Sequence, residues 1–301
     1  GAYSIIYLGV TPTEAVDKLA GHTSSGLNRV LLTILHKALH LGLVNFEDFN
    51  EDDFVNLDNI KLNWVIPRKF LLFFGPVSYV DGLHFPPKRY LEYFRQTGVK
   101  SIIRLSHLKY DANPFVDTNI CHYDLNIDRS VPSEQDLNCF LEICENTEGS
   151  VVIHNRDLLG RSGALIAAYL VKHYRFTAGE ALAWVRLCSP DCVLEPQISW
   201  ITKNESSLRN AGDEYRRQQL ENADRIPHHA LGLYSYLNDE RKGMDTEHTR
   251  IDEHLNSLSQ EICLDKPPVD VEMVGSINEV EERKIKLRKR FATDIWKKVY
   301  W

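Results

Sequence analysis

The chain has 301 residues, 43% apolar and 26% charged, which excludes a disordered chain, a collagen-like repeat and a disulfide mini-protein. At roughly 150 residues per domain, this length predicts two domains. The 35 Lys and Arg residues against 42 Asp and Glu give a net charge of −7, which excludes a global basic field for nucleic acid.

The first part of the chain predicts two helices and an acidic segment. Residues 11–20 are predicted to be helical because Thr11 can cap the helix and Pro12 stands in its first turn. A second helical run extends from Asn28 to Leu41. The segment 46–62 that follows is predicted to be a solvated linker. Its acidic residues are Glu47, Asp48, Glu51, Asp52, Asp53 and Asp58.

From Asn63 the pattern alternates between short apolar runs and amphipathic helices. The predicted strands are Phe70–Phe74, Ser101–Leu105 and Val151–His154. The predicted helices are Ser133–Asn146, Arg161–Tyr174 and a third that Thr177 and Glu180 open as a capping box, ending near Leu187. This alternation predicts an α/β fold with a mostly parallel central sheet flanked by helices.

The last third has a different character, because residues 206–301 are charged and lack a clean apolar period. We expect a partly disordered tail there. Residues 283–290 contain six basic residues in eight, a pattern typical either of a nuclear-localisation signal or of the polar face of a terminal helix. No run of about eighteen apolar residues occurs, so no membrane span is predicted. The six cysteines show no CxxC spacing, which indicates reduced intracellular thiols.

One loop carries most of the chemistry. The buried run ending at His154 is followed by a short loop and then by a helix that begins at Arg161. A helix N-terminus presents backbone N–H groups and the positive end of the helix dipole, which suits a phosphate. Arg161 can add a bidentate fork to phosphate oxygens. Taken alone, a strand, a loop and one arginine are equally typical of a structural turn.

The spacing of His154, Arg161, Ser162 and Gly163 resembles the signature of the cysteine-dependent protein phosphatases. Four flanking segments resemble the mitotic-exit, or cell-division-cycle-fourteen, dual-specificity phosphatase family, and the likeness runs through most of residues 1–202. These segments are Asn63–Phe70, Cys144–Gly149, Lys172–Thr177 and Ala183–Cys188. The resemblance implies a dual-specificity (protein-tyrosine) phosphatase-like domain over residues 63–205. It also implies that residues 1–45 are the C-terminal part of the family's non-catalytic first domain, whose opening portion is absent.

The loop departs from that family at three positions. Asn155 stands where the family has its nucleophilic cysteine, and a carboxamide forms no anion near neutral pH. Leu158 replaces a glycine, which costs on the order of 1 kcal/mol if the backbone needs a positive φ. Asp157 brings a negative charge worth roughly 3 kcal/mol of repulsion at ~6 Å and an effective dielectric near 20. The predicted phosphate-binding loop comprises His154, Arg156, Asp157, Leu158, Leu159, Gly160 and Arg161.

The resemblance also implies roles for residues outside the loop. Asp128 matches the general acid, although it also fits a turn before a helix. Arg161 matches the phosphate-binding arginine, and Ser162 the hydroxyl that assists the leaving thiolate. Gln197 matches the first of two glutamines near the water-positioning loop, while the second is Ile198 here.

A substrate groove is implied by Tyr110 and by the acidic segment. The family's acidic linker favours basic residues after a phosphoserine-proline, and charge complementarity favours the same peptides here. The groove residues of the acidic segment are Glu51, Asp52, Asp53 and Asp58. By resemblance we expect nuclear and cytoplasmic localisation, with spindle or centrosome association, and phosphoprotein or other protein partners. The sequence gives no signal for a metal or a nucleotide cofactor.

Three hypotheses follow. The first is a pseudophosphatase, an enzyme-like fold that binds phosphoserine-proline peptides or partner proteins without hydrolysing them. The second is an active protein phosphatase in cell-cycle control, acting on phosphorylated Ser, Thr or Tyr. The third is a scaffold that uses its surface and tail while the pocket stays empty. Three concerted changes in one loop favour the first.

Overall fold

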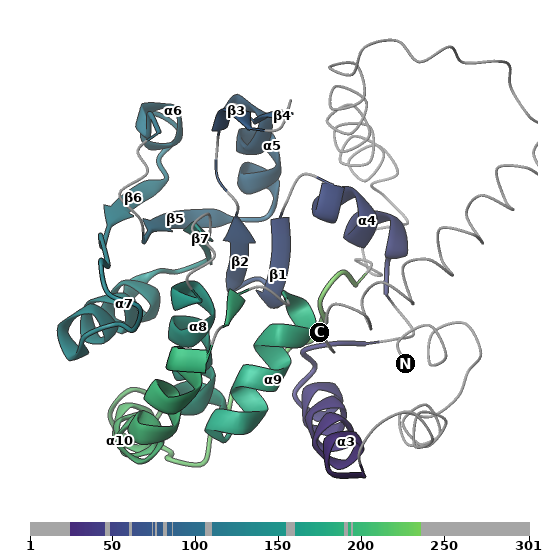
Figure 1. The fold of residues 1–301 in the computed structure, drawn as a ribbon, viewed down its shortest axis with the longest axis vertical. Helices are drawn as coiled ribbons and strands as arrows, with labels where there is room; N and C mark the ends of the chain where they lie inside the picture. Colours follow the sequence, from purple (N-terminus) through teal and green to yellow (C-terminus); the bar gives the residue numbers. More distant parts are fainter. Residues whose placement is uncertain are drawn as a thin grey trace, which may run out of the picture.

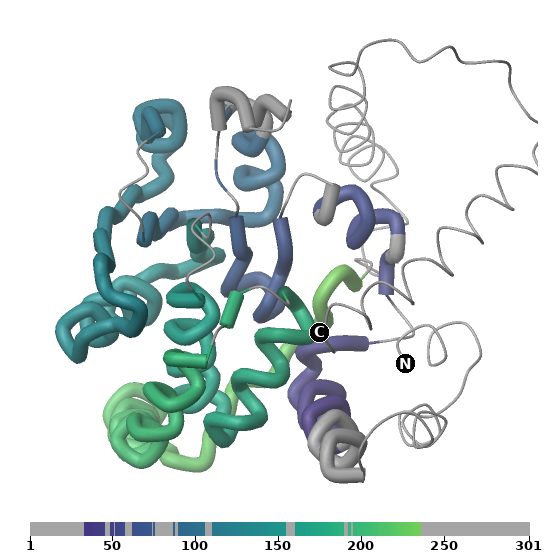
Figure 2. The backbone as a smooth tube through the Cα atoms, in the orientation of Figure 1, coloured from purple at the N-terminus to yellow at the C-terminus, as the bar shows by residue number. Residues whose placement is uncertain are grey.

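The computed structural model describes residues 25–235, except for 46–48, 60–61, 74, 76, 81–82, 86, 106–109, 155–159, 190–191 and 194 (Figure 1). The predicted helix at 11–20 and the basic run at 283–290 lie outside the described residues. Figure 2 shows the course of the same backbone as a tube.

The described elements begin with two helices and continue as alternating strands and helices. In chain order they are α3 (Ser25–His40), α4 (Glu51–Asn59), β1 (Leu62–Ile66), β2 (Phe70–Phe73), β3 (Val77–Val80), β4 (Leu83–Phe85), α5 (Lys88–Gln96), β5 (Val99–Arg104), α6 (Asn113–Val116), β6 (Cys121–Asp124), α7 (Glu134–Asn146), β7 (Ser150–His154), α8 (Arg161–Tyr174), α9 (Ala178–Cys188) and α10 (Glu195–Leu220).

Five of the strands form one sheet in the order β1-β2-β7-β5-β6. β1 is antiparallel to β2, whereas β2, β7, β5 and β6 run parallel to their neighbours. Every residue of the central strand β7 is buried, as is typical of a parallel strand covered on both faces. The prediction of an α/β fold with a mostly parallel sheet is confirmed. β3 and β4 form a separate two-stranded sheet.

Helix α8 is the centre of the helical packing. All of its residues are buried, and it packs against α7, α9 and α10 (Figure 1). The predicted capping box of Thr177 and Glu180 is present at the start of α9. No helix in this described part of the chain is long and apolar enough to cross a membrane.

Two segments differ from the sequence prediction. The predicted linker 46–62 contains the helix α4, and α10 continues past residue 206, where the charged tail was expected to begin. α10 is ordered by its contact with the end of α8. A Cβ on Gly212 would lie 1.9 Å from the Lys172 carbonyl oxygen, so glycine permits close approach of the two helices. Arg216, 1% exposed, donates to the Lys172 carbonyl at 2.7 Å.

Buried histidines accompany this packing. His173 Nε2 lies 2.8 Å from Glu145 Oε1, which also accepts from Lys172 Nζ at 2.5 Å. Burial lowers the pKa of His173, although its hydrogen bond to Glu145 opposes the shift. Farther along, burial and the neighbouring His228 lower the pKa of His229, whose Nε2 lies 2.8 Å from the Tyr174 hydroxyl. Both imidazoles are therefore favoured as the neutral form in the folded protein.

We expect the free energy of unfolding to fall as the pH drops below about 6.5, the ordinary histidine pKa. Since the folded pKa values of His173 and His229 are lowered, the unfolded chain binds protons first, and stability is lost on acidification. Urea unfolding at pH 7.5, 6.5 and 5.5 measures this, and His229→Gln should flatten the profile. An unchanged midpoint from pH 7.5 to 5.5 would contradict the prediction.

Candidate functional site

The register of the sheet places one residue from each strand in a single row. The paired residues are Leu62 with Phe73, Phe73 with His154, His154 with Arg104, and Arg104 with Asp124. This row marks the carboxyl end of the parallel strands, where ligands bind in open α/β sheets. The loops after β7 and β6 leave from this end, and α4 enters it just before β1. The candidate site therefore extends along one edge of the sheet.

His154 ends β7 in the middle of that row and is 1% exposed. Its ring makes an edge contact with Tyr110, at 5.4 Å between centroids, and lies 6.0 Å from Phe73. Gly75, just after β2, has a φ of +103°, and a Cβ there would lie 2.1 Å from His154 Nε2. A glycine at position 75 therefore gives the imidazole its room.

The start of α8 holds the residues predicted to bind phosphate. Gly160 is the N-cap residue with a left-handed φ of 71°, and Arg161 and Ser162 follow in the first turn. Arg161 is 5% exposed and Ser162 is 1% exposed. Burial lowers the pKa of Arg161, and the charge of Asp128 opposes that shift. A buried guanidinium at a helix N-terminus, within electrostatic reach of a carboxylate, is an arrangement suited to an anion.

The intervening loop residues lie outside the described residues. These are Asn155, Arg156, Asp157, Leu158 and Leu159. The structure accordingly describes the loop at its two ends, where His154 ends the strand and Gly160 begins the helix.

The predicted general acid lies on the loop after β6. We call this loop, residues 125–132, the acid loop. Backbone hydrogen bonds fix its start, since the N–H groups of Leu125 and Ile127 donate to the carbonyls of Arg104 and Leu105 at 3.0 Å each. Asp128 follows and is exposed. The fully buried amide of Gln197, from the first turn of α10, donates to the Ser130 carbonyl. Gln197 therefore contacts the acid loop directly, whereas Ile198 packs against the core.

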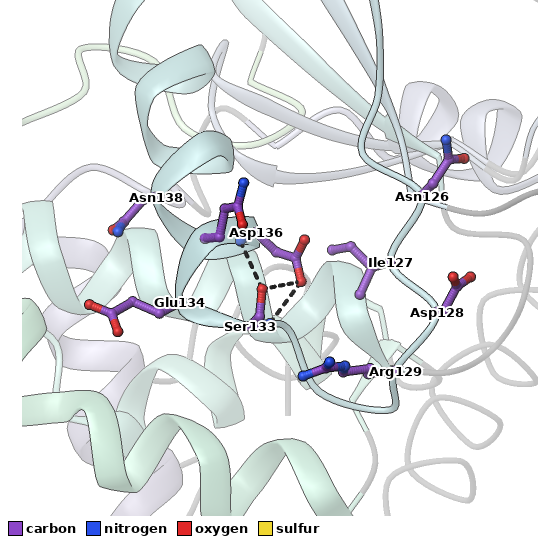
Figure 3. A pocket seen from close by; sticks show the side chains of 9 residues that line it. Asn126, Ile127, Asp128, Arg129, Ser133, Glu134, Asp136 and Asn138 are labelled. Atoms are coloured by element: carbon purple, nitrogen blue, oxygen red, sulfur yellow. Dashed lines mark hydrogen bonds between the residues drawn. The ribbon is translucent and has the colours of Figure 1, made fainter.

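A surface pocket of about 730 Å³ lies beside Asp128 (Figure 3). Its described walls are residues 126–129 of the acid loop and residues 133–136 and 138 at the start of α7. In Figure 3 the Ile127 side chain points toward α7, whereas the Asp128 carboxylate points away from it. Ser133 and Asp136, which form the capping box of α7, both line the pocket (Figure 3).

Tyr110 belongs to a packed polar cluster behind His154. Its hydroxyl lies 2.8 Å from His122 Nε2, and Arg104 donates to its carbonyl at 3.1 Å. Arg104 also makes two hydrogen bonds of 2.7 Å to the Asp124 carboxylate. Burial raises the pKa of Tyr110 well above its ordinary value, so the phenol stays protonated.

Sequence reasoning missed Arg104, His122 and Asp124. The available signal was an arginine at the end of a run otherwise typical of a buried strand, since an arginine there needs a carboxylate partner.

The acidic residues of the predicted groove belong to α4. Asp52 is exposed and Asp53 is half-buried, while the side chains of Glu51 and Asp58 lie outside what the structure describes. α4 packs against β1 and ends shortly before Leu62, the first residue of the row (Figure 1). The sheet thus brings α4 to one end of the row and the loop that carries Asp128 to the other, with His154 between them.

The chain is similar in sequence to known protein phosphatases. Residues 83–175 match the family described as "Polymorphic toxin system, DSP-PTPase phosphatase". The dual specificity protein phosphatase CDC14C of Homo sapiens is 39% identical, over 76% of this chain and 56% of that protein. CDC14B of Mus musculus is also 39% identical, over 75% of this chain and 51% of that protein. This chain thus spans about half the length of these curated relatives.

Solved structures with similar folds are more distant in sequence. Human DUSP28 is 20% identical with a TM-score of 0.37. The match covers 49% of this chain and 95% of the DUSP28 chain. The active form of Tk-PTP is 21% identical with a TM-score of 0.39. The match covers 48% of this chain and 96% of the Tk-PTP chain.

The sheet order, with a histidine ending the central strand and an arginine opening the helix after it, defines an α/β domain of the dual-specificity, protein-tyrosine phosphatase-like class. Within that class the chain is a homologue of the CDC14 dual-specificity phosphatases, at about 39% identity over three quarters of its length.

We expect Gly75→Ala to destabilise the protein and displace the His154 ring. Alanine would have to adopt a positive φ that disfavours a Cβ, and its methyl group would overlap the imidazole. Together these effects should lower the free energy of unfolding by about 1–3 kcal/mol. Thermal unfolding and the ¹H–¹³C signals of the histidine rings measure the two effects. Gly179→Ala is the matched control, because a Cβ there meets nothing within 4 Å. An unchanged melting temperature and unchanged His154 signals would disprove the prediction.

Proposed function

We propose that this chain is a pseudophosphatase of the CDC14 type, which binds proline-directed phosphoserine sites or other protein partners without hydrolysing phosphate. One observation carries the proposal: Asn155 follows directly on His154, the buried residue that ends β7, at the position of the family's nucleophile. Its amide lone pair is delocalised, so it cannot form the covalent phosphoenzyme that this family's mechanism requires.

Three of the cysteines that the structure describes, Cys144, Cys188 and Cys192, offer no replacement. Cys192 comes near the site, because its carbonyl oxygen would lie 2.1 Å from a Cβ on Gly163 in the first turn of α8. Its thiol, however, donates to the Ser189 carbonyl at 2.7 Å and is buried. Burial raises the pKa of both Cys144 and Cys188, which keeps them as unreactive thiols.

Features that suit anion binding remain even though the nucleophile is absent. Arg161 is held at the N-terminus of α8, where the helix dipole and the guanidinium both favour a phosphate. Asp157 and Leu158 in the same loop oppose binding by charge and by backbone strain. We therefore infer weaker phosphate binding than in an intact loop, with the rest of the affinity coming from the bound polypeptide.

The acidic helix α4 supports a preference for basic peptides. It reaches the same edge of the sheet as His154, and Asp52 is exposed on it. Basic residues after a phosphoserine-proline would be attracted to this charge. Phosphoproteins with proline-directed sites are therefore the proposed partners.

The rival proposal is an active protein phosphatase that acts on phosphorylated Ser, Thr or Tyr in cell-cycle control. The electrostatic pairing of Asp128 with Arg161 and the contact of Gln197 with the acid loop favour it, since both belong to a hydrolytic site. It requires a nucleophile other than a cysteine at position 155.

We expect saturable binding of a phosphoserine-proline peptide that is followed by lysines, measured by fluorescence anisotropy, and clearly weaker binding of its unphosphorylated form. Arg161→Lys should weaken binding of the phosphopeptide about tenfold, because lysine keeps the charge but lacks the bidentate fork of the guanidinium. Arg217→Ala removes an exposed cation at the far end of α10 and should change nothing. Equal binding of both peptide forms would refute phosphate recognition.

Turnover of an aryl phosphate separates the two proposals. We expect the chain itself to stay at background, Asn155→Cys to restore little activity, and Asn155→Cys with Asp157→Ala and Leu158→Gly to restore much more. Background turnover in the unmodified chain supports the pseudophosphatase. Turnover that disappears in Arg161→Ala would establish the rival. Full rescue by Asn155→Cys alone would show that Asp157 and Leu158 do not impair the loop.

A further inference from the structure

The segment after α10, residues 221–235, crosses back over the start of the described chain, and we call it the strap. Its backbone pairs with the turn after α3: the His229 N–H donates to the Leu41 carbonyl at 3.0 Å, and the Leu233 N–H donates to the Leu43 carbonyl at 2.8 Å. Two segments far apart in sequence are thereby joined by their main chains.

Two glycines, one on each side, allow this close approach. A Cβ on Gly42, whose φ is +69°, would lie 2.0 Å from the His229 carbonyl oxygen. A Cβ on Gly232 would lie 2.6 Å from the Asn45 backbone nitrogen. Any other residue at either position would push the strap away from the turn.

Tyr234 connects the strap to both α4 and the sheet. Its carbonyl accepts from the Asn50 N–H at 2.6 Å, and its hydroxyl accepts from the Trp64 N–H of β1 at 3.0 Å. Its ring packs edge-on against Phe49 and Phe54, at 5.7 and 5.0 Å between centroids. Its φ of 55° is unusual for an aromatic residue, and such strain persists only where surrounding contacts impose it.

Asn50, whose N–H donates to the Tyr234 carbonyl, immediately precedes α4. Asn50 is 3% exposed, and its side-chain oxygen accepts from the Asp53 N–H at 3.2 Å, in the manner of an N-cap. Displacing Tyr234 would therefore release the first turn of the acidic helix.

The strap is anchored to the anion-binding helix as well. The His229 ring stacks on Tyr174, the last residue of α8, with 9° between the ring planes. The strap thus has one contact to the helix that begins at Arg161 and another to the helix that carries the acidic groove.

We propose that the strap is a specificity-determining element that acts through Tyr234: it sets the position of α4 relative to Arg161 at the start of α8, and so sets the preference for basic residues after the phosphosite. The preference itself rests on the proposed function, whereas the placement of α4 by the strap does not. Tyr234 is a positioning residue that touches α4 and β1 rather than the ligand.

The test uses Tyr234→Ala, Tyr234→Phe and Gly232→Ala in the full chain, with Gly179→Ala as the control for adding a methyl group. The first readout is hydrogen–deuterium exchange of the α4 amides. We expect Tyr234→Ala and Gly232→Ala to speed exchange in α4 and in residues 41–45, while β7 and α8 stay protected. Tyr234→Phe, which loses only the bond to Trp64, should have an intermediate effect.

The second readout is the ratio of affinities for two phosphopeptides, one followed by lysines and one by alanines. We expect the two disruptive variants to lower this ratio roughly fivefold, the size expected from one or two exposed ion pairs, with the alanine peptide unaffected. A chain that binds neither peptide would refute the proposed function, and α4 exchange would still decide the role of the strap. Unchanged exchange in α4, or equal loss of both peptides, would overturn the proposal.

Discussion

The parallel alignment of β7 with β2 and β5 is the constraint on which the site depends. It brings the carboxyl ends of three buried strands to a common level, so that His154 lies between Phe73 and Arg104. Backbone hydrogen bonds fix this register, and a slip of one residue would exchange the two faces of β7. The start of α8 therefore has little freedom of position. The position of Arg161 in the first turn of α8 is thus a consequence of the sheet.

The residues on either side of the predicted phosphate loop are held by the scaffold of the domain. His154 packs near Phe73, Arg161 lies in the first turn of α8, and Gln197 donates to the Ser130 carbonyl. These contacts belong to the folded domain under either proposed function.

The sequence predicted the elements whose apolar period was clear, namely β2, β5, β7 and the helices α7, α8 and α9, with errors of one or two residues at their ends. It missed β6, since its residues are mostly exposed and show no buried face. α4 and the later part of α10 were also hidden, because their polar residues act through caps and carbonyls, such as Asn50 and Arg216. In the site, local sequence indicated the loop ends and Asp128, whereas the Arg104–Asp124 pair depends on strand neighbours far apart in the chain.

The two ends of α8 are complemented differently. At its carboxyl end the guanidinium of Arg216 binds the carbonyls of Lys172 and His173, so the chain itself supplies the countercharge. At its amino end, among the residues that the structure describes, Asp128 acts on Arg161 by its charge, and it lies on a different loop and is exposed to solvent. If the chain binds phosphate as proposed, a ligand phosphate arriving there replaces an interaction that Arg161 already makes with Asp128. Asp128 would then be an internal competitor for that phosphate.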